Sequence, residues 1–171
     1  MPDSLTGLPT HRDLGKNIPN EATLALWVDI DGLIWLNDQL GFEAGHRAIT
    51  SVAAVLGTVL EPVATGLFRV AGDEFLALLQ KQDLNAAITL ADDAVRAVDS
   101  LRIPYQRADR PSANNVQINV AVLRLEPEAL TQSLGQYGLG DPLHALVADT
   151  IYREKIRSGV PAGIVVTVSV A

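Results

Sequence analysis

Two stretches decide the fold: residues 24–30, LALWVDI, and residues 66–79, GLFRVAGDEFLALL. In the first stretch leucine, valine and isoleucine occupy every second position, which is the period of a strand. In the second stretch two apolar runs, 66–70 and 75–79, flank the residues AGDE, which predicts a hairpin with a Gly-Asp tip. We therefore expect three strands, with two carboxylates at the tip of the hairpin.

The pattern outside these strands predicts helices and two further strands. Apolar residues at spacings of three and four give each expected helix one buried stripe. Asp83 or Asn85 is expected to cap the second helix, and Asp141 the third, with Pro142 at its first position. The expected helices are 43–60, 85–101 and 142–157, the expected strands are 116–125 and 164–170, 131–141 is expected to be a loop, and 104–115 a polar loop or a hairpin arm. This order predicts a layered α/β sandwich, with helices flanking a mixed, partly antiparallel sheet.

Composition excludes several classes of function. The 171 residues fit one domain, 1–171, and the net charge of −7 argues against a nucleic-acid binder. The absence of Cys excludes thiolate chemistry, and three scattered His argue against a His-built metal site. No apolar stretch approaches the roughly 20 residues that span a bilayer, and the N-terminus lacks a signal pattern. We expect a cytoplasmic domain without membrane contact of its own, although the whole protein could be membrane-anchored.

Carboxylates gather at the predicted strand ends. Asp29 and Asp31 point to the same face at the end of the first strand, and Asp73 and Glu74 lie at the hairpin tip. If the hairpin lies beside the first strand, its tip and Asp29 share one edge of the sheet. Converging carboxylates there would suit Mg²⁺, with waters and phosphate oxygens as further ligands. Each pattern taken alone is also typical of solvated turn residues.

Five segments resemble, in order, the characteristic blocks of GGDEF domains. They are DSLTGLPTHR at 3–12, DIDGLIWLNDQLGFEAGH at 29–46, RVAGDEF at 69–75, VQINVAV at 116–122 and ADTIYREKIRSG at 148–159. The resemblance covers essentially the whole chain. It implies a palm-like fold, as in nucleotidyl cyclases, and a diguanylate cyclase reaction, in which two protomers condense two GTP molecules into cyclic di-GMP.

The resemblance also implies roles for individual residues. Asp73 would lie beside the attacking 3′-hydroxyl, Asn37 would recognise guanine, and Lys155 would contact phosphate. The implied residues are Asp29, the Ile30 backbone carbonyl and Glu74 for Mg²⁺ or Mn²⁺, Asp73 and Glu74 for catalysis, and Asn37, His46, Ala71, Gly72 and Lys155 for the nucleotide.

Several positions depart from the family pattern. Ala71 replaces the first Gly of the signature, which is the smallest possible change. Ile34 replaces a phosphate-contacting Lys, and Gly159 and Val160 stand where the family has an Arg. The stretch 62–65, PVAT, lacks the charged residues of the product-inhibition motif, so we expect no product feedback there.

His46 replaces the second guanine-binding residue, an Asp. A neutral His offers one acceptor where a carboxylate accepts from two guanine donors. The alternative is that His46 is a core residue, because it precedes Ile49 by three positions and Ala53 by seven.

Three functions remain open. The chain is a degenerate module that binds Mg²⁺–GTP and regulates a partner domain, an active diguanylate cyclase that works as a homodimer, or a structural dimerisation module. We also expect it to be part of a longer signalling protein with a linked sensor or phosphodiesterase domain.

Overall fold

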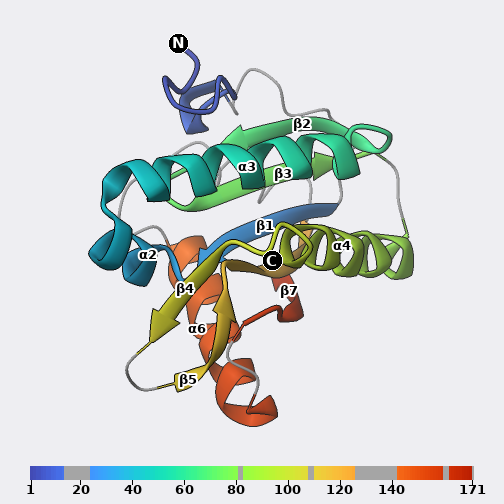
Figure 1. The fold of residues 1–171 in the computed structure, drawn as a ribbon. Helices are drawn as coiled ribbons and strands as arrows, with labels where there is room; N and C mark the ends of the chain where they lie inside the picture. The colour runs from blue at the N-terminus through green and yellow to red at the C-terminus, as the bar shows by residue number, and fades with distance from the viewer. Residues whose placement is uncertain (14–23, 81–82, 108–109, 126–141, 160–161, 171) are drawn as a thin grey trace.

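The first of the predicted strands forms β1 (Leu24–Asp31), the central strand of a five-stranded sheet in the computed structural model. The structure describes residues 1–171 except 14–23, 81–82, 108–109, 126–141, 160–161 and 171. The other strands are β2 (Ala64–Arg69), β3 (Glu74–Leu79), β6 (Gln117–Leu125) and β7 (Val165–Val170). The strand order is β2-β3-β1-β6-β7 (Figure 1), with β6 and β7 parallel and the other neighbours antiparallel. The sheet is therefore mixed, as predicted.

Helices cover both faces of this sheet. They are α3 (Phe42–Leu60), α4 (Leu84–Asp99) and α6 (Pro142–Ser158). Leu26 and Val28 of β1 belong to a buried cluster that includes residues of α3 and α4. Trp27, which points the other way, belongs to a second cluster with Ile151 of α6. The alternation along β1 thus assigns α3 and α4 to one face and α6 to the opposite face (Figure 1).

The predicted helices agree with the structure to within two residues at each end. Asp83 is the cap of α4, since its carboxylate accepts a hydrogen bond from Ala86 N–H at 2.8 Å. The short segment α2 (Leu33–Leu40) precedes α3. The expected cap at Asp141 and the expected loop at 131–141 lie outside the described residues. None of the helices in the described ranges is long and apolar enough to cross a membrane.

The predicted hairpin is present, with its tip shifted by one residue. β2 ends at Arg69 and β3 begins at Glu74, because Val70 N–H donates to the Glu74 carbonyl at 2.9 Å and draws Glu74 into the strand. Strands β4 (Pro104–Arg107) and β5 (Arg110–Asn115) pair antiparallel, so the hairpin arm, one of the two alternatives expected for 104–115, is confirmed.

Candidate functional site

The pairing of β1 with β3 brings the acidic residues together. Asp29 lies opposite Glu74 in the antiparallel register, and Ile30 N–H donates to the Asp73 carbonyl at 3.0 Å. The hairpin thus lies beside β1, which is the condition under which its tip and Asp29 were expected to share one edge of the sheet. The adjacent Phe75 is fully buried, whereas Asp29 and Glu74 are partly exposed, so these carboxylates mark where the sheet opens to solvent.

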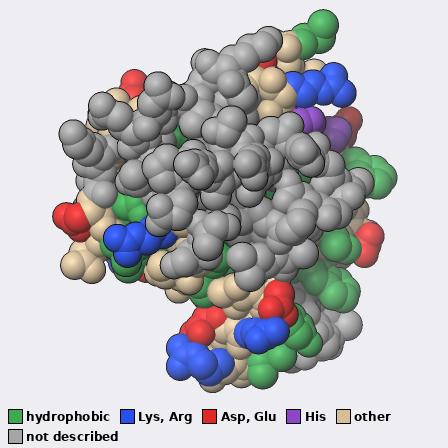
Figure 2. Space-filling model, turned by 180° about the vertical axis from the view of Figure 1, so that it is seen from behind, with side chains coloured by type: hydrophobic (Ala, Val, Ile, Leu, Met, Phe, Trp, Pro, Cys, Tyr) green, Lys and Arg blue, Asp and Glu red, His purple; other side chains and the backbone are tan. Residues whose placement is uncertain are grey.

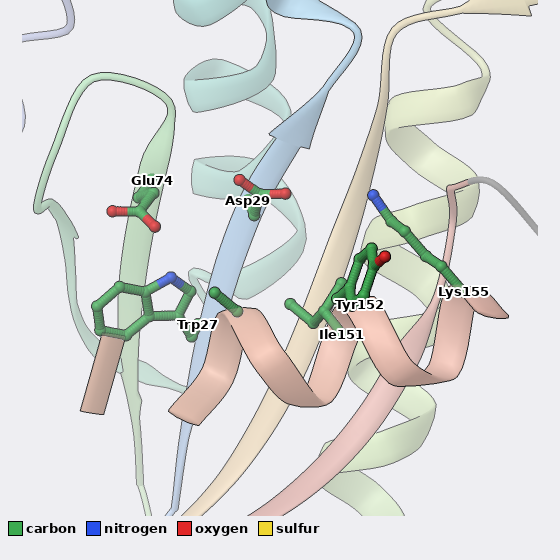
Figure 3. A pocket seen from close by; sticks show the side chains of 7 residues that line it. Trp27, Asp29, Glu74, Ile151, Tyr152 and Lys155 are labelled. Atoms are coloured by element: carbon green, nitrogen blue, oxygen red, sulfur yellow. The ribbon is translucent and has the colours of Figure 1, made fainter. Parts of the chain in front are cut away.

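A cavity of about 180 Å³ lies between this sheet edge and α6. Figure 3 shows the Asp29 and Glu74 carboxylates on neighbouring strands, with Lys155 reaching from α6. The lining residues are Trp27, Asp29, Glu74, Ala148, Ile151, Tyr152 and Lys155. The cavity therefore unites three of the residues that were predicted to bind metal or phosphate.

The Asp29 carboxyl is in an unfavourable place for a negative charge. Burial raises its pKa to about 6, although a hydrogen bond from Asn119 opposes the rise. The negative charges of Asp73 and Glu74 contribute to this rise, and the positive charge of Lys155 opposes it. A carboxylate that is costly to ionise and has two acidic neighbours favours a cation beside it.

Asn119 is a site residue that the sequence did not single out. It is fully buried on β6 directly opposite Asp29. Its Nδ2 donates to Asp29 Oδ2 at 3.3 Å, and its Oδ1 accepts from Ile164 N–H at 3.4 Å. The available signal was an amide within the apolar run 118–123, because a buried polar side chain needs partners.

Lys155 is held by an acid outside the cavity lining. Its Nζ donates to Asp31 Oδ1 at 2.8 Å, and the two side chains are 25% and 17% exposed. Asp31 lies two residues after Asp29 on β1, so both carboxylates are on the face that α6 covers.

Arg69 fixes the signature turn, which is the turn at residues 70–73 between β2 and β3. Its Nε and Nη2 donate to the Gly72 carbonyl at 3.1 and 2.6 Å. Ala71 and Gly72 are exposed, and neither lines the cavity. Ala71 does not adopt a positive φ, so replacing the usual glycine introduces no backbone strain.

Asn37 and His46 lie on the helix pair α2–α3, outside the cavity lining. The Asn37 Oδ1 atom is buried without a hydrogen-bond partner, and a Cβ at Gly45 would lie 1.9 Å from it. His46 is exposed. The alternative of a core histidine is therefore wrong, because α3 turns Gly45 and Ile49 inward and His46 outward.

Few cations are available to a bound anion. Among the described lining residues Lys155 is the one positive charge, and Ile34 at the start of α2 is 71% exposed. Arg157 is engaged with Glu154 at 2.6 and 2.7 Å. Figure 2 shows basic and acidic side chains beside one another at the lower end of the molecule, where α6 lies in Figure 1.

The two carboxylates at the cavity fit a hard divalent cation that is also coordinated by the phosphates of a bound ligand. Within the described ranges no three His, Asp or Glu side chains are grouped as a metal site. Asp29 and Glu74 supply two carboxylates, and Mg²⁺ is commonly bound by one or two carboxylates together with substrate phosphates.

The fold and the site define an α/β domain with a carboxylate pair and a lysine suited to a phosphate-bearing ligand. The chain belongs to the GGDEF family, since the family profile described as "Diguanylate cyclase, GGDEF domain" matches residues 1–136. The match includes four of the five predicted blocks, and α6 with Lys155 follows it. No curated protein sequence matches the chain.

Solved structures share the fold. The GGDEF domain of TpbB (YfiN) from Pseudomonas aeruginosa is 20% identical with a TM-score of 0.69, covering 98% of this chain and 94% of that one. The coiled coil and GGDEF domain of DgcB from Caulobacter crescentus, in complex with c-di-GMP, is 18% identical with a TM-score of 0.65, covering 98% and 85%. An S helix-GGDEF-EAL fragment of LapD from Vibrio cholerae, bound to c-di-GMP, is 14% identical with a TM-score of 0.68, covering 98% and 36%. These similarities confirm the predicted fold class.

Proposed function

We propose that this chain is a GGDEF module of cyclic di-GMP signalling that binds Mg²⁺–GTP and regulates a linked domain, with weak or no cyclase activity. The observation that carries the proposal is the cavity in which Asp29, Glu74 and Lys155 face a common space. Two carboxylates suit the cation, and one ammonium group suits a phosphate.

All the residues that the family pattern assigns to the metal are present in this chain. Asp29, Glu74 and the Ile30 carbonyl would hold Mg²⁺ or Mn²⁺, which offsets phosphate charge when bound. The cost of ionising the buried Asp29 beside Asp73 and Glu74 supports a cation at this place.

The part of the site that would recognise the nucleotide base differs from the family pattern. Asn37, which the family resemblance assigns to guanine recognition, has a buried Oδ1 without a hydrogen-bond partner. At the family's second guanine-binding position, the exposed His46 replaces a carboxylate. We therefore propose that the site binds a purine nucleotide with reduced preference for guanine.

The phosphate-binding part of the site has lost cations, and this is why we propose weak catalysis. Ile34 is exposed where the family has a lysine, and Gly159 stands in the region of the family's arginine. Each electrostatic group aimed at developing charge is often worth about 10²–10³-fold in rate. Losing two of them would slow turnover by several orders of magnitude.

An active cyclase is the second candidate. Asp29, Asp73 and Glu74 are all present at one sheet edge, which favours it. In that case two copies of the chain would bring two nucleotides together.

A thermal-shift experiment tests nucleotide binding. With Mg²⁺–GTP at about 100 times its dissociation constant, the melting temperature is expected to rise by roughly 5–10 °C. Asp29→Ala and Glu74→Ala should remove the rise, each compared with its own nucleotide-free sample. Glu61→Ala, at an exposed acid after α3, is the matched control and should keep it. An undiminished response in both site variants would contradict the proposed metal site.

A product assay separates the two candidates. The unmodified domain is incubated with GTP and Mg²⁺ at high protein concentration, and cyclic di-GMP is quantified. We expect little or no product. Robust conversion would establish the active cyclase instead.

A further inference from the structure

Lys155 has two possible carboxylate partners and pairs with only one of them. It lines the same cavity as Asp29, and its charge already lowers the pKa of Asp29. Its ion pair is nevertheless with Asp31, at 2.8 Å. Asp29 and Asp31 are two residues apart on one strand, a distance of about 7 Å. The flexible four-carbon side chain of a lysine can cover that distance.

The pair is unlike the helical ion pairs of this chain. In the described i,i+3 and i,i+4 pairs the arginine is at least 67% exposed. Lys155 and Asp31 are 25% and 17% exposed and join residues 124 positions apart. Their pairing therefore fixes the end of α6 against the end of β1 at the rim of the cavity.

We propose that Asp31 is a positioning residue that holds Lys155 at the rim of the cavity and away from Asp29, which keeps Asp29 and Glu74 available to a cation. The inference rests on the proposed metal and nucleotide site. An ammonium group seated on Asp29 would occupy the oxygen that a divalent cation needs. Held by Asp31 through one N–H, Lys155 still has two N–H donors for a phosphate.

The test measures cation binding directly. Tb³⁺ is a hard cation that prefers carboxylate oxygens, and its emission is sensitised by a nearby tryptophan. Trp27 lines the cavity with Asp29 and Glu74, so it reports Tb³⁺ at this place. Trp27→Phe should abolish the sensitised emission, and Asp29→Ala should weaken Tb³⁺ binding.

A double-mutant cycle isolates the role of Asp31. Asp31→Asn should weaken Tb³⁺ binding about five- to tenfold, because Lys155 then turns to Asp29. In a Lys155→Met background the same substitution should change the affinity by no more than about twofold. Equal weakening in both backgrounds would show that Asp31 acts only as a remote charge, and would overturn the proposal. No weakening in either background would also overturn it.

Two controls separate this inference from the fold and from the proposed function. Asp149→Asn breaks the ion pair with Arg153 on the same helix, at 2.8 Å, and should leave Tb³⁺ affinity unchanged. Circular dichroism checks that each variant is folded. If the parent shows no sensitised emission, or if Asp29→Ala binds Tb³⁺ like the parent, the metal site fails and the inference fails with it. If these pass and the cycle is additive, only the inference fails.

Discussion

The N-terminal segment is tied to the signature turn through Arg69, and we expect Asp3→Asn to weaken this link. Arg69 Nη1 donates to Asp3 Oδ1 at 2.9 Å, while its Nε and Nη2 hold the Gly72 carbonyl. The Asp3 Oδ1 atom also accepts from the backbone and hydroxyl of Thr6 at 2.8 and 2.7 Å. Removing the Asp3 charge therefore affects both the start of the chain and the turn that carries Asp73.

The size of the effect follows from the ionisation of Asp3. Burial raises its pKa, but hydrogen bonds from Arg69 and Thr6 outweigh burial and lower the pKa from 3.8 to about 2. A pKa lowered this far on folding is linked to at most about 2.5 kcal/mol of stability. Since the two side chains keep 13% and 21% exposure, screening reduces this, and we expect a loss of about 1–2 kcal/mol at pH 7.

The pH dependence has a definite sign. Because the folded-state pKa of Asp3 lies below the unfolded one, its stabilisation is complete above about pH 4 and is lost as the pH falls toward 2. The difference in free energy of unfolding between the parent and Asp3→Asn should therefore shrink to about half near pH 3. Urea unfolding between pH 7 and pH 3 measures it.

The matched control is an ion pair on the surface. Asp93→Asn breaks the pair with Arg96, whose side chains are 53% and 67% exposed, and should cost less than about 0.5 kcal/mol. The reasoning is refuted if Asp3→Asn costs no more than this control. It is also refuted if the cost of Asp3→Asn is the same at pH 7 and pH 3.

Three further predictions concern the residues expected to bind the base and the phosphates. Gly45→Ala should lower the melting temperature and GTP affinity, because its Cβ would come within 1.9 Å of Asn37 Oδ1. Gly57→Ala has no atom within 4 Å of its Cβ and should instead gain about 0.5–1 kcal/mol in thermal unfolding. His46→Asp should increase the preference for GTP over ATP in calorimetry, and an unchanged ratio would contradict the assigned role. Ile34→Lys with His46→Asp should raise cyclic di-GMP formation in a product assay, by about 10²-fold or more if the lysine reaches phosphate.

Local patterns predicted most of the sheet and its helices. The period of two in β1 predicted which of its residues share a face, and Asp83 was one of the two residues expected to cap α4. The start of β3 was displaced by one residue because it depends on the hydrogen bond between Val70 and Glu74 across the turn. Such a bond forms only when the two strands are already paired, and no sequence period reports it.

The candidate site was predictable only in part. The sequence predicted that Asp29 and the hairpin tip share a sheet edge only if the hairpin lies beside the first strand, and the pairing of β1 with β3 meets that condition. Asn119 and Asp31 acquire their roles from β6 and α6, which are distant in sequence from β1. The exposure of His46 depended on which face α3 turns to the sheet, since its spacing to Ile49 also fitted a core position.

The charges around the cavity explain why binding and catalysis can separate in this chain. In the proposed function one nucleotide brings its own divalent cation, so Mg²⁺ would satisfy Asp29 and Glu74, and Lys155 would be sufficient to contact phosphate. The condensation step is different, because it places two triphosphates together and builds further negative charge. Only groups that stabilise that extra charge more than the bound substrate accelerate the step. Ile34 offers no such group, whereas the carboxylates proposed to bind the metal remain. Under the proposed function, the loss of fixed cations would therefore reduce turnover far more than it would reduce affinity for a single Mg²⁺–nucleotide.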